Sequence, residues 1–322
     1  MLRKCFAYAA LLLLGIFSGP GFAAYPDQPI HLIVPFAPGG SADIMARLMA
    51  QQLNGELGQS LIVENKPGAG GNIGGAFVAH ASPDGYTVLL AAAGPTVINP
   101  SLYKRMPFDP SKDLAPVTLI EREHNLMVVN PSVPAKNLEE FIAYAKSHSG
   151  QLTFGSPGNG SPAHLAGELL NQMADLHLQH IPYKGSAPAL TDLIAGHISL
   201  MIDNMPALLP AVKNGSLRAI AVASEHRAEA APDIPTFEEA GLKGYVVTAW
   251  KGLMVPAKTP APVIERLRDA VVKVLAKPDV RQRLLDLGAE PVGSTPAEFG
   301  AQISEETGFF GKLVKSTGAS ID

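Results

Sequence analysis

The stretch that decides the fold of this chain is Phe36-Ala-Pro-Gly-Gly-Ser-Ala-Asp43, and a second stretch, Phe154-Gly-Ser-Pro-Gly-Asn-Gly-Ser-Pro-Ala-His164, repeats its design. Each follows a short apolar run and precedes a segment with helical periodicity, so each predicts a strand, a glycine-rich turn and a helix N-terminus. Such a turn leaves several backbone N–H groups without intrahelical acceptors, at the positive end of the helix dipole. Two anion-binding turns in one chain predict a carboxylate-bearing ligand held from two sides.

Around the first turn (36–43), predicted strands and helices alternate. Strands are expected at 30–35, 61–64 and 86–92, and helices at 42–57 and 76–81. A third turn, 93–97, follows the last of these strands. Alternation of this kind predicts a parallel sheet, whose ligands bind beyond the carboxyl ends of the strands.

The second turn (154–164) belongs to a new series that begins near Asn125. Two strands, 117–120 and 125–129, are expected to be separated by the charged Glu121-Arg-Glu-His124. Ser161 is the predicted N-cap of a helix over 162–173. Further strands are expected at 152–154, 178–181, 198–202 and 217–222, further helices at 138–147 and 187–195 and after Pro206, and tail helices at 262–275, 278–287 and 296–314.

The length of 322 residues favours more than one core. We predict an α/β fold of two lobes, in which each lobe is a mainly parallel sheet flanked by helices and the ligand cleft lies between the lobes. Lobe 1 would comprise 24–124 plus 252–322, and lobe 2 would comprise 125–251. Chain crossings near Asn125 and Trp250 would form the hinge.

The N-terminus has the pattern of a secretory signal peptide. Arg3 and Lys4 precede an apolar core over 6–17, and Gly21-Phe22-Ala23 suits cleavage after Ala23, so 1–23 are the predicted signal. Cys5, the only cysteine, would leave with it, and the exported chain would have no disulfide. The net charge of −4 and the absence of a Lys/Arg cluster argue against nucleic-acid binding.

Several kinds of chemistry fit the sequence poorly. The run 158–163 matches G-x-G-x-x-A, but His180 stands where a ribose-binding acid is expected about 20 residues later. The residues two before Ser156 and Ser161 are Phe154 and Asn159, so neither serine lies in a nucleophile elbow. The glycine-rich run 68–75 lacks the Lys-Ser/Thr ending of a P-loop, and the histidines show no metal spacing. We therefore expect no cofactor, no metal and no catalytic residue.

Some candidate site residues have an ordinary structural explanation as well. Asp43 either caps its helix or accepts from water or a ligand amine, and His164 is either a helix-end residue or part of the cleft lining. Trp250 is expected to pack at the hinge rather than to contact ligand. The predicted ligand-binding residues are Phe36, Ala37, Gly39, Gly40, Ser41, Asp43, Thr96, Ser156, Asn159, Gly160, Ser161, His164, Lys184, Gly185 and Asp203.

The chain resembles the Bug family, the periplasmic solute receptors of tripartite tricarboxylate transporters. The resemblance extends over essentially the whole mature chain. Its motifs are Val34-Pro-Phe-Ala-Pro-Gly-Gly-Ser-Ala-Asp43, Val63-Glu-Asn-Lys-Pro-Gly-Ala-Gly-Gly-Asn-Ile-Gly74, Gly155-Ser-Pro-Gly-Asn-Gly-Ser161, Tyr183-Lys-Gly185 and Pro232-Asp-Ile-Pro-Thr-Phe-Glu-Glu-Ala-Gly241.

The resemblance implies a two-lobed periplasmic-binding-protein fold, type II-like, whose lobes close on a carboxylate that is held between the two turns partly through ordered waters. It also implies a monomeric receptor in the periplasm that delivers its solute to integral-membrane transporter subunits without chemistry. The solute is left open among amino acids, di- and tricarboxylates and aromatic acids. A sensor that presents its closed form to a membrane receptor and a carboxylate-processing enzyme are the alternatives.

Overall fold

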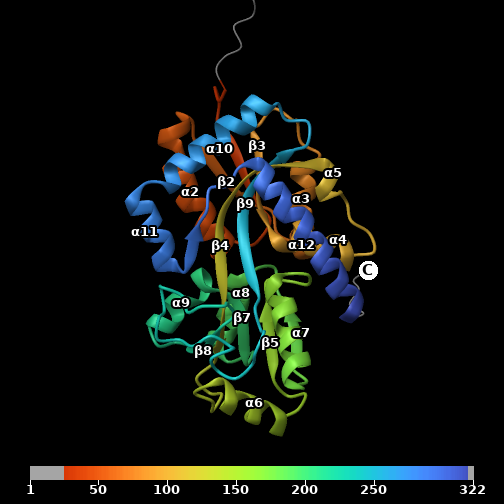
Figure 1. The fold of residues 1–322 in the computed structure, drawn as a ribbon, viewed down its shortest axis with the longest axis vertical. Helices are drawn as coiled ribbons and strands as arrows, with labels where there is room; N and C mark the ends of the chain where they lie inside the picture. The colour runs from red at the N-terminus through yellow and green to blue at the C-terminus, as the bar shows by residue number, and fades with distance from the viewer. Residues whose placement is uncertain (1–24, 318–322) are drawn as a thin grey trace, which may run out of the picture.

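The computed structural model describes residues 25–317, so the predicted signal peptide (1–23) lies outside the described residues. Two groups of strands and helices follow one another along the longest axis of the molecule (Figure 1). No helix within 25–317 is long and apolar enough to cross a membrane.

The first group contains the segments on either side of the first turn. Its elements are β1 (Ile30–Val34), α2 (Ser41–Leu57), β2 (Leu61–Asn65), the short helix η1 (Ala69–Gly71), α3 (Asn72–Ala79), β3 (Thr87–Ala92), the π-helical η2 (Gly94–Ile98), α4 (Asn99–Leu102) and α5 (Pro110–Asp113). The tail adds α10 (Ala261–Leu275), α11 (Pro278–Leu287), β10 (Ala289–Pro291) and α12 (Pro296–Thr317).

The second group is built around the second turn. Its elements are α6 (Leu138–Ser147), β5 (Thr153–Ser156), α7 (Pro162–Ala174), β6 (Gln179–Pro182), α8 (Ser186–Ala195), β7 (Leu200–Asn204), α9 (Met205–Lys213) and β8 (Arg218–Val222). Two long strands, β4 (Leu114–Val129) and β9 (Thr248–Pro256), run along the molecule between the groups (Figure 1).

The strands form one path of order β2-β1-β3-β9-β4-β7-β5-β6, and β8 and β10 also pair with β4. Parallel pairing joins β1 to β2 and β3, and joins β5 to β6 and β7. The crossing strands are antiparallel to their neighbours, since β9 pairs with β3 and β4 in that sense, and β4 with β7. Each group therefore has a parallel core, and the two cores are joined through antiparallel strands.

The prediction of two strands split at 121–124 was wrong, because β4 is continuous through these charged residues. Its side chains alternate along this run: Glu121 and Glu123 are buried, whereas Arg122 is exposed. The charge of Glu123 is paired inside the molecule with Lys251 of β9, which allows the strand to continue. Between 114 and 124 β4 pairs with β9, and from Asn125 onward it pairs with β7 and β8.

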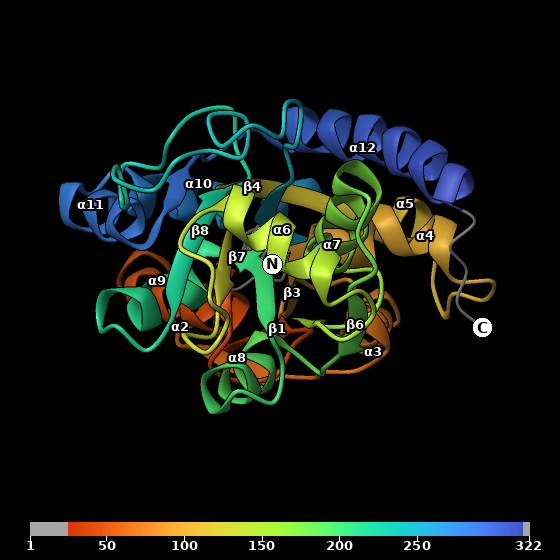
Figure 2. The ribbon, with the colours of Figure 1, turned by 90° about the horizontal axis from the view of Figure 1, so that it is seen from below.

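Separate apolar clusters hold the elements in place. Helices α2 and α10 pack on β1 and β3 through side chains such as Met49, Leu90 and Val271. The tail helix α12 runs along one side of the molecule toward α4 (Figure 2). Its Phe299 packs with Trp250 and Val97, so the tail helix covers the first group.

Candidate functional site

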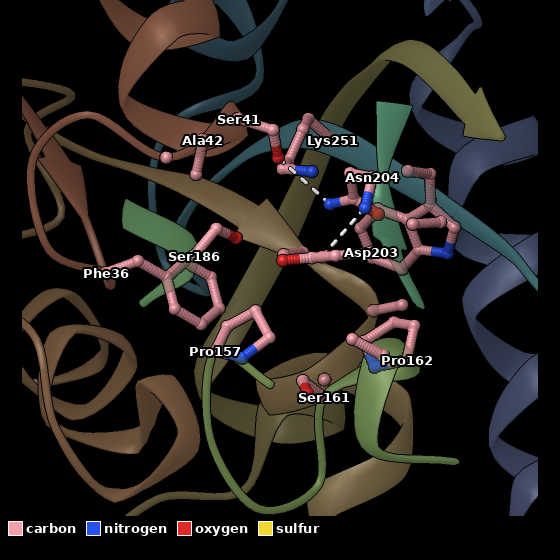
Figure 3. A pocket seen from close by; sticks show the side chains of 17 residues that line it. Phe36, Ser41, Ala42, Pro157, Ser161, Pro162, Ser186, Asp203, Asn204 and Lys251 are labelled. Carbon is pink, nitrogen blue, oxygen red and sulfur yellow. Dashed lines mark hydrogen bonds between the residues drawn. The ribbon is translucent and has the colours of Figure 1, made fainter. Parts of the chain in front are cut away.

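A pocket that is partly open to solvent lies between the two groups of elements. Its walls come from both turns, from the end of β3 with the turn after it, from the starts of α8 and α9, and from β9 near Trp250 (Figure 3). The lining residues are Phe36, Gly40, Ser41, Ala42, Ala92, Ala93, Gly94, Pro157, Ser161, Pro162, Ala163, Ser186, Asp203, Asn204, Ala249, Trp250 and Lys251.

Four helices of nine residues or more begin at this pocket. The N-terminal residues of α2 and α7 line it, as do Ser186 at the start of α8 and Asn204 at the N-cap of α9. Side-chain capping is present only in α7 among these four, where Ser161 Oγ accepts from the His164 N–H at 3.1 Å. Uncapped first-turn N–H groups and four converging dipoles give the pocket a positive backbone potential.

The two sides of the pocket touch each other directly. Asn204 Nδ2 donates to Ser41 Oγ at 2.9 Å, and the Ala37 N–H donates to the Lys184 carbonyl at 3.1 Å. A Cβ placed on Gly40 would be 3.3 Å from Ser186 Cβ. The first turn therefore lies against the N-terminus of α8 with little space between them.

A family model described as the tripartite tricarboxylate transporter family receptor matches residues 45–319. The chain belongs to this receptor family. The Bug resemblance is thereby confirmed, since the protein BugT of Bordetella pertussis is 37% identical over 319 residues, or 97% of this chain and 98% of BugT.

Solved structures agree with this assignment and with the predicted α/β periplasmic-binding-protein fold. A periplasmic transporter is 43% identical, with a TM-score of 0.90 over 93% of the receptor and 100% of that chain. An R. palustris protein solved with adipate is 35% identical, with a TM-score of 0.90 over 92% of the receptor and 99% of that chain. MatC from Rhodopseudomonas palustris, solved with bound malate, is 35% identical, with a TM-score of 0.86 over 90% of the receptor and 100% of MatC.

Five of the residues predicted from the receptor's sequence line the pocket: Phe36, Gly40, Ser41, Ser161 and Asp203. Three more lie at the contact between the two sides, because Ala37 bonds to the Lys184 carbonyl and approaches Gly185. The remaining predicted residues do not line this pocket; they are Gly39, Asp43, Thr96, Ser156, Asn159, Gly160 and His164.

Asp43 holds the first turn from inside. Its carboxylate accepts from Arg47 Nε at 2.9 Å, from Asn65 Nδ2 at 3.0 Å and from the Gly39 N–H at 3.0 Å. Asn65 also donates to the Phe36 carbonyl at 3.0 Å. The carboxylate of Asp43 is thus fully used in fixing the backbone of residues 36–40.

Two stacked histidines support the second turn from behind. The His164 and His180 ring centroids are 4.1 Å apart. His164 Nδ1 accepts from the Gly160 N–H at 3.2 Å, and His180 Nε2 is 2.6 Å from Ser156 Oγ. Burial lowers the pKa of His164 to about 4, and burial together with His164 lowers the pKa of His180 to about 3, so both rings are neutral at neutral pH.

Gly160 of the second turn lies against Asn99 of α4, which belongs to the first group of elements. Its φ is +78°, and a Cβ there would lie 1.9 Å from Asn99 Oδ1, which only glycine avoids. Asn99 in turn donates to Asn72 Oδ1 at 2.7 Å and to the Gly70 carbonyl at 3.2 Å. Asn99 therefore links the second turn to the glycine-rich run 68–75, which follows β2.

Sequence reasoning missed much of the pocket. Ser186 and Asn204 begin helices after strands, and this strand–helix pattern was the available signal for them. Trp250, expected at the hinge, lines the pocket; its indole N–H donates to Glu306 Oε2 at 2.7 Å, and its ring packs edge-on against Phe299. Ala92 and Ala93 lie at the end of β3 and in the third predicted turn, the edge where ligands were expected, although neither was predicted as a binding residue. For Ala249 the sequence carried no signal.

Lys251 is the lining residue with a positive charge, and it was not predicted. Its ammonium forms a buried ion pair with Glu123 of β4. Burial and the nearby Glu123 raise the pKa of Glu121 well above its ordinary value. Within 25–317, no three His, Cys, Asp or Glu side chains are grouped so that they could hold a metal ion.

Proposed function

We propose that this receptor captures a small carboxylate-bearing solute in the pocket between the first and second turns. The observation that carries the proposal is the convergence of the α2 and α7 N-termini on one pocket. The ligand carboxylate would accept hydrogen bonds from first-turn N–H groups of Ser41, Ala42 and Ala163, directly or through water. Adipate and malate in related structures support a carboxylate as the recognised group.

The magnitudes fit an enclosed pocket better than an open groove. Micromolar affinity requires about 8 kcal/mol. Each helix dipole contributes about 0.3–1 kcal/mol at an exposed site and about 2 kcal/mol where partly buried, so dipoles alone are too weak. Hydrogen bonds to a charged group add about 1.5–3 kcal/mol each, provided that water is excluded. Phe36, Ala249 and Trp250 supply the apolar walls that exclude it.

We also propose that the enclosing motion is a hinge about the crossing strands β4 and β9. The division would be the predicted one, with 24–124 plus 252–322 in one lobe and 125–251 in the other. The exchange of β4 partners at Asn125 supports a boundary there. The receptor would act as a monomer in the periplasm and deliver its solute unchanged to membrane subunits of a tripartite transporter.

A thermal-shift screen followed by native mass spectrometry tests the proposed function. The panel would contain mono-, di- and tricarboxylates, amino acids and aromatic acids, each with its methyl ester or amide as a control. We expect at least one carboxylate to raise the melting temperature while its neutral derivative does not. Equal effects from acid and derivative, or a panel without a single carboxylate hit, would contradict the proposal.

Transport is tested separately in the organism. A strain lacking the receptor should lose uptake of the radiolabelled acid identified in the screen, and a copy of the gene should restore uptake. Normal uptake with a lost transcriptional response to the acid would instead indicate a sensor. Conversion of the acid by purified receptor, followed by NMR, would indicate an enzyme.

A further inference from the structure

One carboxyl group of the pocket lacks a full set of donors. Asp203 is the residue before the last in β7, is 1% exposed, and accepts through Oδ1 from the Asn204 N–H at 2.8 Å. Figure 3 shows its other end directed toward the space between Ser186 and Pro157. By distance and angle, no donor within 25–317 forms a hydrogen bond with Oδ2, although the Ser186 hydroxyl is close enough to lower the pKa of Asp203.

Several other polar side chains of the wall already have hydrogen-bond partners, whereas the Ser186 hydroxyl lies beside Asp203. Ser41 and Asn204 bond to each other, and the Ser161 hydroxyl donates to the Gly158 carbonyl at 2.8 Å. Among the side-chain atoms that line the pocket in the described chain, Asp203 Oδ2 is the buried acceptor left without a partner. A buried carboxylate oxygen without a donor is costly, so a ligand that supplies one gains affinity.

The charged side chains near Asp203 do not compensate the negative charge of its carboxylate. Lys251 of β9 lowers the pKa of Asp203, but its ammonium is engaged by Glu123 of β4, and Glu123 raises the pKa of Asp203. Burial has the largest effect and raises this pKa to about 6. At about pH 7.5 the carboxyl is therefore mostly ionised, in a pocket where four helix N-termini favour an anion.

These observations divide carboxylates into two classes. A solute with carboxylates alone would bring a second anion beside Asp203 and leave Oδ2 unpaired. A solute with a hydroxyl or ammonium group next to its carboxylate would place the anion at the helix N-termini and the donor on Asp203. We propose that Asp203 is the specificity-determining residue of the receptor and selects carboxylates that carry a hydroxyl or ammonium donor; this inference rests on the proposed function.

Isothermal titration calorimetry on the mature receptor at about pH 7.5 tests the inference with matched ligands. The probes are malate and aspartate against succinate, glutamate against glutarate, and lactate against propionate. Within each pair that binds, we expect the ligand with the donor to have the higher affinity, by about tenfold or more. This is the usual contribution of a hydrogen bond to a charged group. Comparing malate with aspartate distinguishes a hydroxyl from an ammonium donor.

The variant Asp203→Asn, with exposed Asp233→Asn as its matched control, assigns the effect to this residue. In Asp203→Asn the donor-bearing ligand should weaken by about tenfold, while the ligand without the donor binds equally well or more tightly. If this variant does not fold, the wild-type receptor decides. The ratio of its affinities for the ligands with and without a donor should shrink between about pH 7.5 and pH 5 as Asp203 is protonated.

The failures of the two proposals are distinguishable. Wild-type receptor that binds succinate or glutarate as tightly as the donor-bearing partner overturns the role of Asp203 and leaves carboxylate capture intact. Proton uptake on succinate binding, seen as a dependence of the heat on buffer, also overturns it, since protonated Asp203 would then donate to the ligand. If no carboxylate binds at all, the proposed function fails, and this inference fails with it.

Discussion

Asn204 Nδ2 donates a 2.9 Å hydrogen bond to Ser41 Oγ, and this bond joins the N-termini of α9 and α2 across the edge of the pocket. The two residues are 163 positions apart in the chain. Both lie at the start of a helix, where the backbone is fixed, so the bond has a defined geometry only when the two sides of the receptor are together.

The variant Ser41→Ala tests the contribution of this bond to ligand retention. Loss of a neutral hydrogen bond costs about 1 kcal/mol, so we expect affinity to fall about fivefold, mostly through faster ligand dissociation. Stopped-flow fluorescence of Trp250 would measure both rates. Ser147→Ala, which removes an exposed hydroxyl of α6, is the control, and identical dissociation rates in both variants would show that the bond does not secure the closed form.

A substitution at Gly40 tests whether the two sides of the pocket approach each other closely. Its backbone φ of −85° suits any residue, so the fold should tolerate a side chain there. A Cβ would nevertheless lie 3.3 Å from Ser186 Cβ, and the branches of valine would extend into the pocket. We expect Gly40→Val to weaken ligand binding by tenfold or more, on the order of 1.4 kcal/mol, with an unchanged melting temperature.

The control for this variant lies in the same helix. A Cβ added to Gly55 of α2 would meet no atom within 4 Å, so Gly55→Ala should leave affinity unchanged and stabilise the helix by about 0.5–1 kcal/mol. Full ligand affinity in Gly40→Val would contradict the direct contact between the first turn and α8. Gly160 is unsuitable for this test, because a side chain there meets Asn99 and is strained by its positive φ.

The stacked histidines predict a loss of stability in acid. Both have a lower pKa in the folded state, about 4 for His164 and about 3 for His180, than the ordinary value of 6.5. Their contribution is therefore complete above about pH 6.5 and is lost as the pH falls toward those values. Each should cost about 2 kcal/mol of unfolding free energy by pH 5, measured by urea unfolding.

A substitution identifies the source of the acid effect. His180→Gln should reduce the difference in unfolding free energy between about pH 7 and pH 5, whereas exposed His177→Gln should not. An equal pH dependence in wild type and His180→Gln would mean that other groups control acid stability. Such a result would leave the hydrogen bonds behind the second turn intact but remove their predicted coupling to pH.

The pH dependence of stability that we predict for Asp203 has the opposite sign to that of the histidines. Its pKa is raised from 3.8 to about 6 in the folded state, so its ionisation destabilises the fold as the pH rises through this interval. The difference corresponds to a cost of about 3 kcal/mol above pH 6. We expect Asp203→Asn to raise the unfolding free energy at about pH 8 by up to that amount, and to gain nothing below about pH 4.

The measurement is urea unfolding of wild type and Asp203→Asn across this pH range. A variant less stable than wild type at pH 8 would mean that the carboxylate is well satisfied without ligand. A gain in stability together with a loss of donor-bearing ligands would identify Asp203 as a residue kept for binding at the expense of the fold.

Local pattern predicted much of the fold and part of the site. The glycine-rich turns, Ser161 as N-cap and most helices follow from short-range rules, and the structure agrees with them. The continuity of β4 was missed because the charge of Glu123 is cancelled by Lys251, which lies 128 residues away in sequence. Such pairing leaves no local signal.

The same limitation applies to the positions of the predicted site residues. Asp43 and His164 have the residue types of a binding site, but their tertiary partners, Asn65 and His180, hold them in supporting positions outside the pocket lining. Conversely, Ala92 and Ala249 look like ordinary strand residues and line the pocket, because β3 and β9 both border it. Which side of a turn faces a ligand is set by packing that one sequence does not reveal.

Recognition of one carboxylate by two helix N-termini underlies the proposed function of the receptor. A crystal structure of the receptor with its tightest-binding carboxylate from the screen would locate that group. We predict that the carboxylate lies between the N-termini of α2 and α7, bonded to first-turn N–H groups directly or through one water. A carboxylate bound elsewhere, for example in the groove formed by His124, Arg281 and Glu290, would contradict recognition by the two turns.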